Sequence, residues 1–289
     1  MDVIYSYKKI DGYIKKMDDR FYQMARISVN SAKKHYNTIL YTDSECKKLF
    51  KENNVNFDKI IVLDDIENYN NMFYSLIKLF AMRTHSGPFI HIDLDTIITN
   101  HIDVKTDTAF GYSECYFNDV KDVYLNDFFM NSYYRLLKKL FPNKVDTDEY
   151  DFRIVPNASL FYCKTKKIKK IINDIIDYFD ESIWLSASEF EEKYNTSIGG
   201  YSSLIEQFFI YHFIQKYNIS CTFLNEIQQI KFNELDIDMD NRKYNYGIIS
   251  IQKLFENKFI HFQNYNDLHN NIRYMLHYID ESLKPKTII

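Results

Sequence analysis

Apolar and polar positions along the first hundred residues follow two periods that alternate. Short β-prone stretches, typical of strands, are separated by stretches in which apolar residues recur every three or four positions, as in a helix. The pattern predicts strands at 3–7, 38–41, 59–63 and 89–92, and helices at 19–35, at 44–53, and from Asn70 or Asn71 to a stop at Gly87-Pro88. Such alternation over short connections is typical of a Rossmann-type, mostly parallel sheet with helices on both faces, so we expect an α/β fold.

After residue 105 the pattern is less regular. It predicts strands at 108–112 and 158–163 and helices at 166–180, 202–217 and 267–280. The sequence contains neither an internal repeat nor a linker rich in Pro, Gly and Ser. We therefore expect one domain over residues 1–289, with a functional division near residue 105.

Composition and charge narrow the class of protein. Hydrophobic residues make up 46% of the 289 positions and charged residues 26%, which is ordinary for a globular protein. The net charge of −4 and the lack of a long basic arm argue against nucleic-acid binding. The basic run at 164–170 is interpreted as a solvated face, with contact to anionic lipid headgroups as the alternative.

Cysteine use and hydropathy bear on the compartment. The four cysteines are scattered singly with no Cys-x-x-Cys pair, which argues against a zinc site and a disulfide framework and fits a reducing compartment. The first residues lack the apolar core of a signal peptide, and no apolar run approaches the ~20 residues of a membrane span. We expect a cytoplasmic protein without a transmembrane segment, and peripheral contact with a membrane stays open.

Asp93-Leu94-Asp95 ends the apolar strand at 89–92 and is the centre of the functional interpretation. Side chains alternate in an extended chain, so the two carboxylates are expected to face one side. Magnesium and manganese prefer such oxygen ligands and leave positions open for phosphate oxygens, as in the diphosphate of a nucleotide sugar. The same spacing recurs at Asp146/Asp148, Asp236/Asp238 and Asp238/Asp240. Only the 93/95 pair terminates an apolar strand in an α/β alternation, where ligands of open sheets gather, and a capping or turn role is the alternative for Asp95.

From these residues the chain resembles glycosyltransferases of the GT-A fold. The resemblance rests on a helix with a basic residue followed by Gly87 to Asp95, and on the segments 4–7 and 39–43; it covers residues 1 to about 115 best. It implies a nucleotide-sugar-binding half at 1–105 and a helical acceptor-side half with a C-terminal helix at 106–289. The implied activity is metal-dependent transfer of a hexose, with retention preferred, from a nucleoside-diphosphate sugar, UDP-sugar favoured, to an acceptor hydroxyl. Glycans, glycolipids and proteins are the implied acceptors, in glycan or polysaccharide synthesis.

The resemblance also assigns a metal and donor site. Asp95 would ligate Mn²⁺ or Mg²⁺ directly, Asp93 would bind metal, ribose or both, and His261 would complete the metal site; His269 and His277 are interpreted as helix-surface residues. Lys78 matches a basic residue that contacts donor phosphate or sugar, although Arg is commoner there, and a surface lysine is the alternative. The further donor-binding residues implied are Tyr5, Ser6, Tyr41, Thr42, Asp43 and Asn157. The family's glycine two positions after the asparagine is Ser159 here.

The acceptor side is expected at Glu206-Gln207, which follow Gly199-Gly200 and resemble an acidic-Gln pair of related enzymes. Together with Asp93 and Asp95 this pair completes the expected catalytic set. A carboxylate there would orient the acceptor hydroxyl or act as general base, with a helix-initiating charge as the alternative role and Glu114 as a second candidate.

Two other functions compete with transfer. A haloacid-dehalogenase-type phosphatase also has Asp-x-Asp after an apolar strand, but its loop continues Gly-Thr near the first strand, whereas Thr96 follows Asp95 directly here and three strands precede it. A non-catalytic protein that binds sugar nucleotides or carbohydrates on the same fold is the second alternative, because a fold does not guarantee chemistry.

Overall fold

The structure is a computed structural model, and it describes most of the first half of the chain and parts of the second. The described residues are 1–9, 17–63, 75–116, 154–179, 187–194, 204–224, 237–238, 243–244 and 259–261. The Asn70 and Asn71 caps and the helix expected at 267–280 lie outside these ranges.

The alternation predicted for the first hundred residues is confirmed. The elements in order are β1 (Asp2–Tyr7), α1 (Asp19–Lys33), β2 (Asn37–Thr42), α2 (Ser44–Glu52), β3 (Lys59–Val62), α3 (Leu76–Thr84) and β4 (Phe89–Ile92). The Asp18 side chain accepts hydrogen bonds from the first backbone N–H groups of α1, and Asp43 caps α2 in the same way, as predicted. Gly87, with φ 115°, takes the chain from α3 into β4.

From residue 96 onwards the chain contains more elements than the pattern predicts. They are β5 (Thr96–Ile98), β6 (Thr108–Tyr116), β7 (Ile154–Cys163), α5 (Ile168–Phe179), α6 (Ala187–Tyr194), η4 (Leu204–Phe209), α8 (Ile210–Lys216), β8 (Cys221–Phe223), β9 (Ile237–Asp238), β10 (Lys243–Tyr244) and β11 (Phe259–His261). Strands β6 and β7 are longer than expected, and the helix expected at 202–217 is divided into the π-helix η4 and the α-helix α8.

Seven strands form the main sheet in the order β3-β2-β1-β4-β7-β6-β8. Strand β1 pairs in parallel with β2 and β4, and β2 pairs in parallel with β3. In this described sheet only β7 runs against its neighbours, pairing antiparallel with β4 and β6, while β8 is parallel to β6. The mostly parallel, Rossmann-type and GT-A-like fold class expected from the sequence is therefore confirmed.

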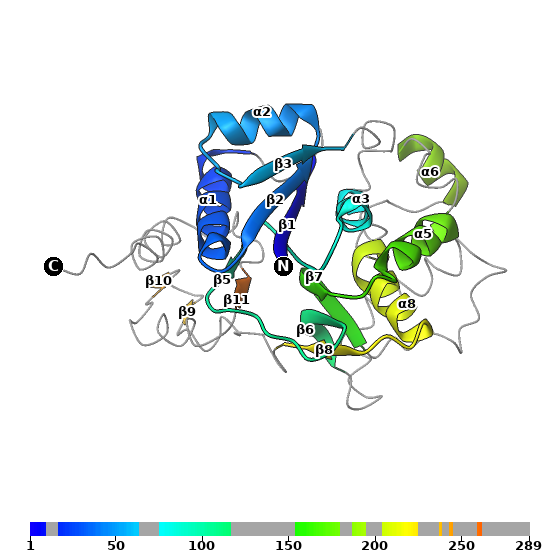
Figure 1. The fold of residues 1–289 in the computed structure, drawn as a ribbon. Coiled ribbons are helices and arrows are strands. Elements are labelled where there is room, and N and C mark those ends of the chain that lie inside the picture. The colour runs from blue at the N-terminus through cyan, green and yellow to red at the C-terminus, as the bar shows by residue number, and fades with distance from the viewer. Residues whose placement is uncertain are drawn as a thin grey trace.

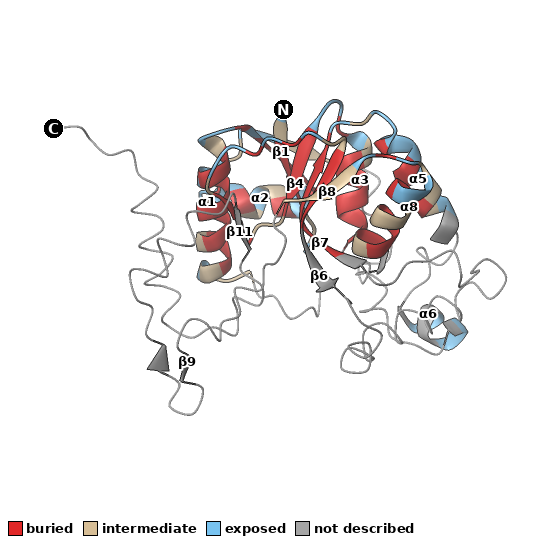
Figure 2. Ribbon diagram, turned by 90° about the horizontal axis from the view of Figure 1, so that it is seen from below, coloured by how far each residue is buried: buried red, intermediate tan, exposed pale blue. Residues whose placement is uncertain are grey.

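Helices cover both faces of this sheet. Helices α1 and α2 lie on one face, and α3, α5 and α8 lie on the other (Figure 1). Successive strand residues belong to two hydrophobic cores, one on each face of the sheet. Val3 and Ile90 pack with α1 and α2, whereas Ile4 and Phe89 pack with α3, α5 and α8. The central strand β4 is buried along its length, whereas the edge strand β8 is of intermediate exposure (Figure 2).

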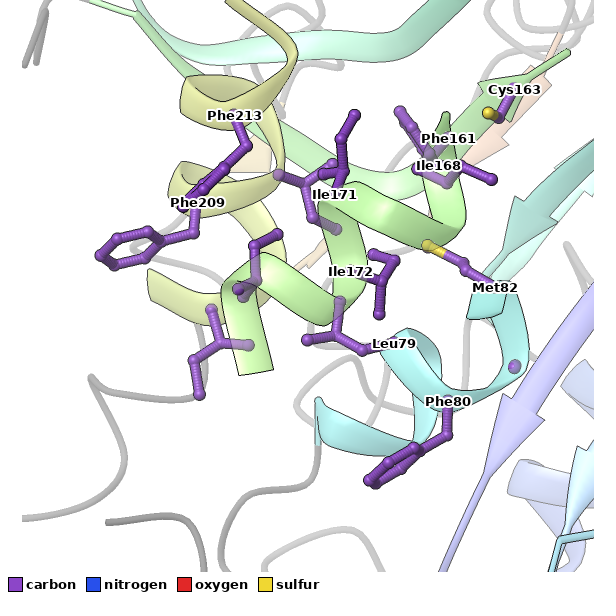
Figure 3. Packing of buried hydrophobic residues seen from close by; sticks show 14 of the residues in the cluster. Leu79, Phe80, Met82, Phe161, Cys163, Ile168, Ile171, Ile172, Phe209 and Phe213 are labelled. Atoms are coloured by element: carbon purple, nitrogen blue, oxygen red, sulfur yellow. The ribbon is translucent and has the colours of Figure 1, made fainter. Parts of the chain in front are cut away.

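The α3–α5–α8 layer is a packed apolar core. Figure 3 shows Ile172 of α5 beside Leu79 of α3, with Phe213 of α8 on the other side of α5. Each of these three side chains is at most 5% exposed. This packing holds α3 rigidly against the sheet, so that the position of any side chain on its inner face is well defined.

Two further expectations concern the surface and the cysteines. The lysines of the run at 164–170 are exposed, as expected of a solvated face. Among the cysteines whose side chains the structure describes, Cys46, Cys163 and Cys221 are free thiols. In the described ranges, no helix combines the length and the apolar character that crossing a membrane requires.

Candidate functional site

The Asp93-Leu94-Asp95 segment lies at the carboxyl end of β4, as expected, but its backbone is not extended. The Asp93 N–H donates to the Ser159 carbonyl of β7 at 2.9 Å, and the Thr96 N–H returns to the Asp93 carbonyl at 3.0 Å. This second bond closes a turn that joins β4 to β5. The expectation of an extended backbone from Asp93 to Asp95 was therefore wrong, because β4 ends at Ile92 and the chain then turns. Asp95 is nevertheless 6% exposed, so its carboxylate lies inside the protein.

Lys78 contacts both the end of β4 and the π-helix η4. Its Nζ lies 2.8 Å from Asp93 Oδ1 and 3.1 Å from Asp93 Oδ2, and 2.6 Å from Glu206 Oε2. Lys78 is 9% exposed and Glu206 is 5% exposed. The alternative of a surface lysine is wrong, since the helix turns this side chain inward between two carboxylates. A buried ammonium needs such partners to offset its lost hydration.

The charge of Lys78 is fixed by this environment. Burial alone disfavours the ammonium form, but the carboxylates of Asp93 and Glu206 outweigh it and raise the pKa of Lys78 above its usual range. Lys78 is therefore cationic throughout the physiological range. The ion pairs bring Asp93, which was expected on the donor side, and Glu206, which was expected on the acceptor side, to one positive charge.

Glu206 lies on the π-helix η4, near the start of a continuous helical segment. A π-helix has a wider turn than an α-helix and is frequently found at functional sites. Glu206 is in the first turn of η4 and is directed at Lys78, while its neighbour Gln207 is partly exposed. The structure thus brings Glu206 to the D-x-D segment, whereas Glu114 is described only in its backbone, within β6.

Strand β7 lies next to Asp93, whose backbone N–H it accepts at Ser159. Asn157 and Ser159 are each 3% exposed, and the Asn157 side-chain oxygen accepts a hydrogen bond from the Ser159 N–H at 2.9 Å. The Asn157 carbonyl oxygen thus supports the backbone that in turn holds Asp93. The side-chain oxygen of Asn157, an expected donor-binding residue, is thus directed at its own strand.

His91 is a site residue that the sequence interpretation missed. It is fully buried on β4, and its Nε2 is 2.8 Å from the Ser6 hydroxyl of β1. Burial and the nearby Lys78 ammonium lower the pKa of His91 to about 3, although Asp93 acts in the opposite direction. The imidazole is therefore neutral. An imidazole within the otherwise apolar stretch at 89–92 was the signal that could have revealed it.

Stability in acid tests the state of His91. Because its folded pKa lies near 3 and an unfolded histidine titrates near 6.5, the unfolded state binds more protons between these values. Stability is thus intact above pH 6.5 and falls as the pH is lowered towards 3, by up to about 1.4 kcal/mol per pH unit. In urea unfolding, the free energy of unfolding should fall less between pH 7 and pH 4.5 for His91→Leu than for the wild type. An equal loss in both proteins would contradict a neutral buried imidazole.

Four expected donor-binding side chains make hydrogen bonds within the fold. The Tyr5 hydroxyl lies 3.3 Å from Ser28 Oγ, and the Tyr41 hydroxyl lies 3.0 Å from His85 Nδ1. Thr42 Oγ1 donates to the Tyr7 carbonyl, and Asp43 caps α2. The structure does not bring these four into the Lys78 cluster; of the expected β1 and β2 residues, Ser6 joins it through His91.

The expected metal ligands are only partly described. Strand β11 pairs antiparallel with β5 so that His261 is opposite Thr96, the residue after Asp95. This register brings the backbone of His261 next to the D-x-D turn, while its side chain lies outside the described residues. Among the side chains that are described, no three of the His, Cys, Asp and Glu type gather as a metal site. The two carboxylates of this segment are oxygen ligands of the kind that suits Mn²⁺ or Mg²⁺.

Solved structures with a similar fold are found at very low identity. Mouse xyloside xylosyltransferase 1 in its apo form is 8% identical, with 91% of this chain and 97% of that chain covered and a TM-score of 0.41. The inositol-1-phosphate CTP transferase of T. maritima is 9% identical, with 98% of both chains covered and a TM-score of 0.47. Such distant likenesses assign no activity to this chain.

Comparison by sequence gives one match. No curated protein matches the chain. A family model, "Family of unknown function (DUF6734)", matches residues 8–251. Since this match spans most of the chain, the protein belongs to the DUF6734 family.

Proposed function

We propose that the protein is a metal-dependent glycosyltransferase that moves a sugar from a nucleoside-diphosphate sugar to an acceptor hydroxyl. The observation that carries the proposal is the buried Lys78, which contacts Asp93 at the carboxyl end of β4 and Glu206 on η4. Ligands of open α/β sheets bind at this end of the strands. The donor-side carboxylate and the acceptor-side carboxylate thus meet at one point.

The charges of the site favour a divalent cation with the donor. Asp93, Asp95 and Glu206 carry three carboxylates, and Lys78 supplies one ammonium, between Asp93 and Glu206. At ordinary ionisation the site keeps two negative charges, which a divalent ion would balance before an anionic diphosphate arrives. Asp95, with His261 from β11 and with Asp93, would hold Mn²⁺ or Mg²⁺. The ion would offset the charge that develops on the diphosphate as the sugar leaves.

The side chains of the chain itself then have separate roles. Lys78 fixes the orientation of Asp93 by contacting both of its carboxylate oxygens and presents a positive charge to donor phosphate. Glu206 is held by the same ammonium at 2.6 Å, which favours a role in orienting the acceptor hydroxyl over removal of its proton. Gln207, partly exposed beside it, is proposed to contact the acceptor. We propose retention of configuration, a glycan, glycolipid or protein acceptor, and a cytoplasmic location.

Nucleotide titration tests this function. We expect UDP to bind when Mn²⁺ is present and to bind far more weakly when the metal is removed with EDTA, measured by calorimetry. A screen of UDP-hexoses without acceptor should then show slow release of the sugar from one of them. Binding without release of any sugar, with all acceptors tested, would favour a non-catalytic binding protein. Absence of metal-dependent binding for both UDP and GDP would refute the proposal.

A further inference from the structure

His91 and Ser6 form a partly buried hydrogen-bonded pair next to the proposed donor site. Ile4 of β1 pairs with His91 of β4, and Ser6 follows Ile4 by two residues on β1. Because side chains alternate in a strand, Ser6 and His91 share the sheet face that α3 covers, and Asp93 contacts Lys78 of that helix. Ser6 is partly exposed there, whereas His91 is fully buried.

The second nitrogen of His91 decides which atom carries the proton. Nδ1 is buried and has no hydrogen-bond partner among the described residues, whereas Nε2 lies 2.8 Å from Ser6 Oγ. A neutral imidazole carries one N–H group. Buried N–H groups without an acceptor are rarer than buried acceptors without a donor, so the proton belongs on Nε2. The Nε2–H group then donates to the Ser6 oxygen.

This tautomer determines what Ser6 offers to a ligand. A hydroxyl oxygen that accepts from His91 keeps its own hydrogen for another partner. Within the described residues, His91 is the hydrogen-bond partner of the Ser6 side chain, so the Ser6 hydroxyl hydrogen has no acceptor among those residues. The opposite tautomer would use up the Ser6 hydrogen and leave only lone pairs at the site. The two tautomers therefore predict opposite preferences for the ligand atom above Ser6.

We propose that His91 is a positioning residue that fixes Ser6 as a hydrogen-bond donor to an acceptor oxygen of the bound nucleotide. The proposal rests on the proposed function for the identity of the ligand. It adds a specificity element to that site: a neutral, oriented O–H group beside the charged Asp93. This role costs free energy of folding, because His91 buries a polar imidazole where an apolar side chain would carry no such penalty.

Two measurements test the pair. Nitrogen-15 NMR of the wild type, with the His91 signals assigned from His91→Leu, should show a protonated Nε2 and an unprotonated Nδ1. In calorimetry, Ser6→Ala and His91→Leu should each weaken binding of UDP with Mn²⁺ by about fivefold, as the loss of one neutral hydrogen bond does. The double variant should be no weaker than the single variants, because both remove the same contact.

Controls separate positioning from folding. His91→Gln keeps an N–H donor and should restore most of the affinity. His85 is also buried and bonded to one hydroxyl, that of Tyr41, so His85→Leu should destabilise the fold without changing nucleotide affinity. Binding of pyrophosphate with Mn²⁺ shows which part of the nucleotide Ser6 contacts. If Ser6→Ala and His91→Leu weaken this binding, the contacted oxygen belongs to the diphosphate; if they do not, it belongs to the nucleoside.

The outcomes are distinguishable from failure of the proposed function. If UDP does not bind the wild type, the nucleotide assignment fails, and this proposal fails with it. If UDP binds but NMR finds the proton on Nδ1, or His91→Leu binds UDP as tightly as the wild type, the positioning role is wrong while the transferase proposal stands.

Discussion

Replacement of Asp95 by asparagine should abolish metal-dependent nucleotide binding while leaving the fold intact. Asparagine has the same shape, but its neutral amide is a poor ligand for a hard divalent cation at a site that depends on carboxylate charge. The loss of one direct anionic ligand is expected to lower the affinity for UDP with Mn²⁺ by at least about a hundredfold. Calorimetry and the rate of sugar release from the donor measure the effect.

The control is an aspartate of similar chemistry away from the turn. Asp107 accepts a hydrogen bond from Ser220 next to β8, so Asp107→Asn should bind nucleotide as the wild type does. Circular dichroism and the unfolding midpoint check that Asp95→Asn remains folded. Near-native turnover by Asp95→Asn would contradict the assignment of the metal site.

Lys78→Met should lower the free energy of unfolding by about 3–5 kcal/mol, the cost of leaving buried charges without their partner. Asp93 and Glu206 would then face each other with no cation between them. The pKa of Lys78 is raised, so its stabilising effect is complete below the unfolded value near 10.5 and is lost only as the pH rises through the higher folded value. The loss should therefore be the same at pH 6 and pH 8 in urea unfolding.

An exposed ion pair provides the matched control. Lys33 contacts Asp58 at 2.9 Å with both side chains substantially exposed, so Lys33→Met should cost less than about 1 kcal/mol. The double variant Lys78→Met with Glu206→Gln should recover part of the loss, because one unpaired carboxylate is removed. Equal effects of the two lysine substitutions would show that Lys78 is not the buried centre described above.

The α/β framework could be predicted because its signals are local. Each helix and strand from β1 to β4 shows its own period, and the Asp43 cap follows from its position at a helix start. Strands β5, β8 and β11 have only three residues each. Such short segments carry no usable period, and they become strands only through pairing with distant partners.

Part of the candidate site also has a local signal in the sequence. Asp93 and Asp95 could be singled out because an apolar strand precedes them, and Glu206 was singled out by resemblance. That Lys78 is buried could not be deduced, since its partner Glu206 lies far along the chain. The bond from Thr96 to Asp93, which turns the D-x-D segment, likewise depends on the three-dimensional path into β5.

The place of β7 in the sheet also bears on how the chain is made. On a ribosome, β4 emerges before β7, so the edge of β4 that β7 later covers stays open while residues 93 to 153 are synthesised. An unpaired strand edge is a template for association with other chains. Lys78 also lacks Glu206 until η4 has emerged. While residues 93 to 153 are synthesised, the nascent chain can therefore pair wrongly through the open edge of β4, and a chaperone that covers this edge would prevent it.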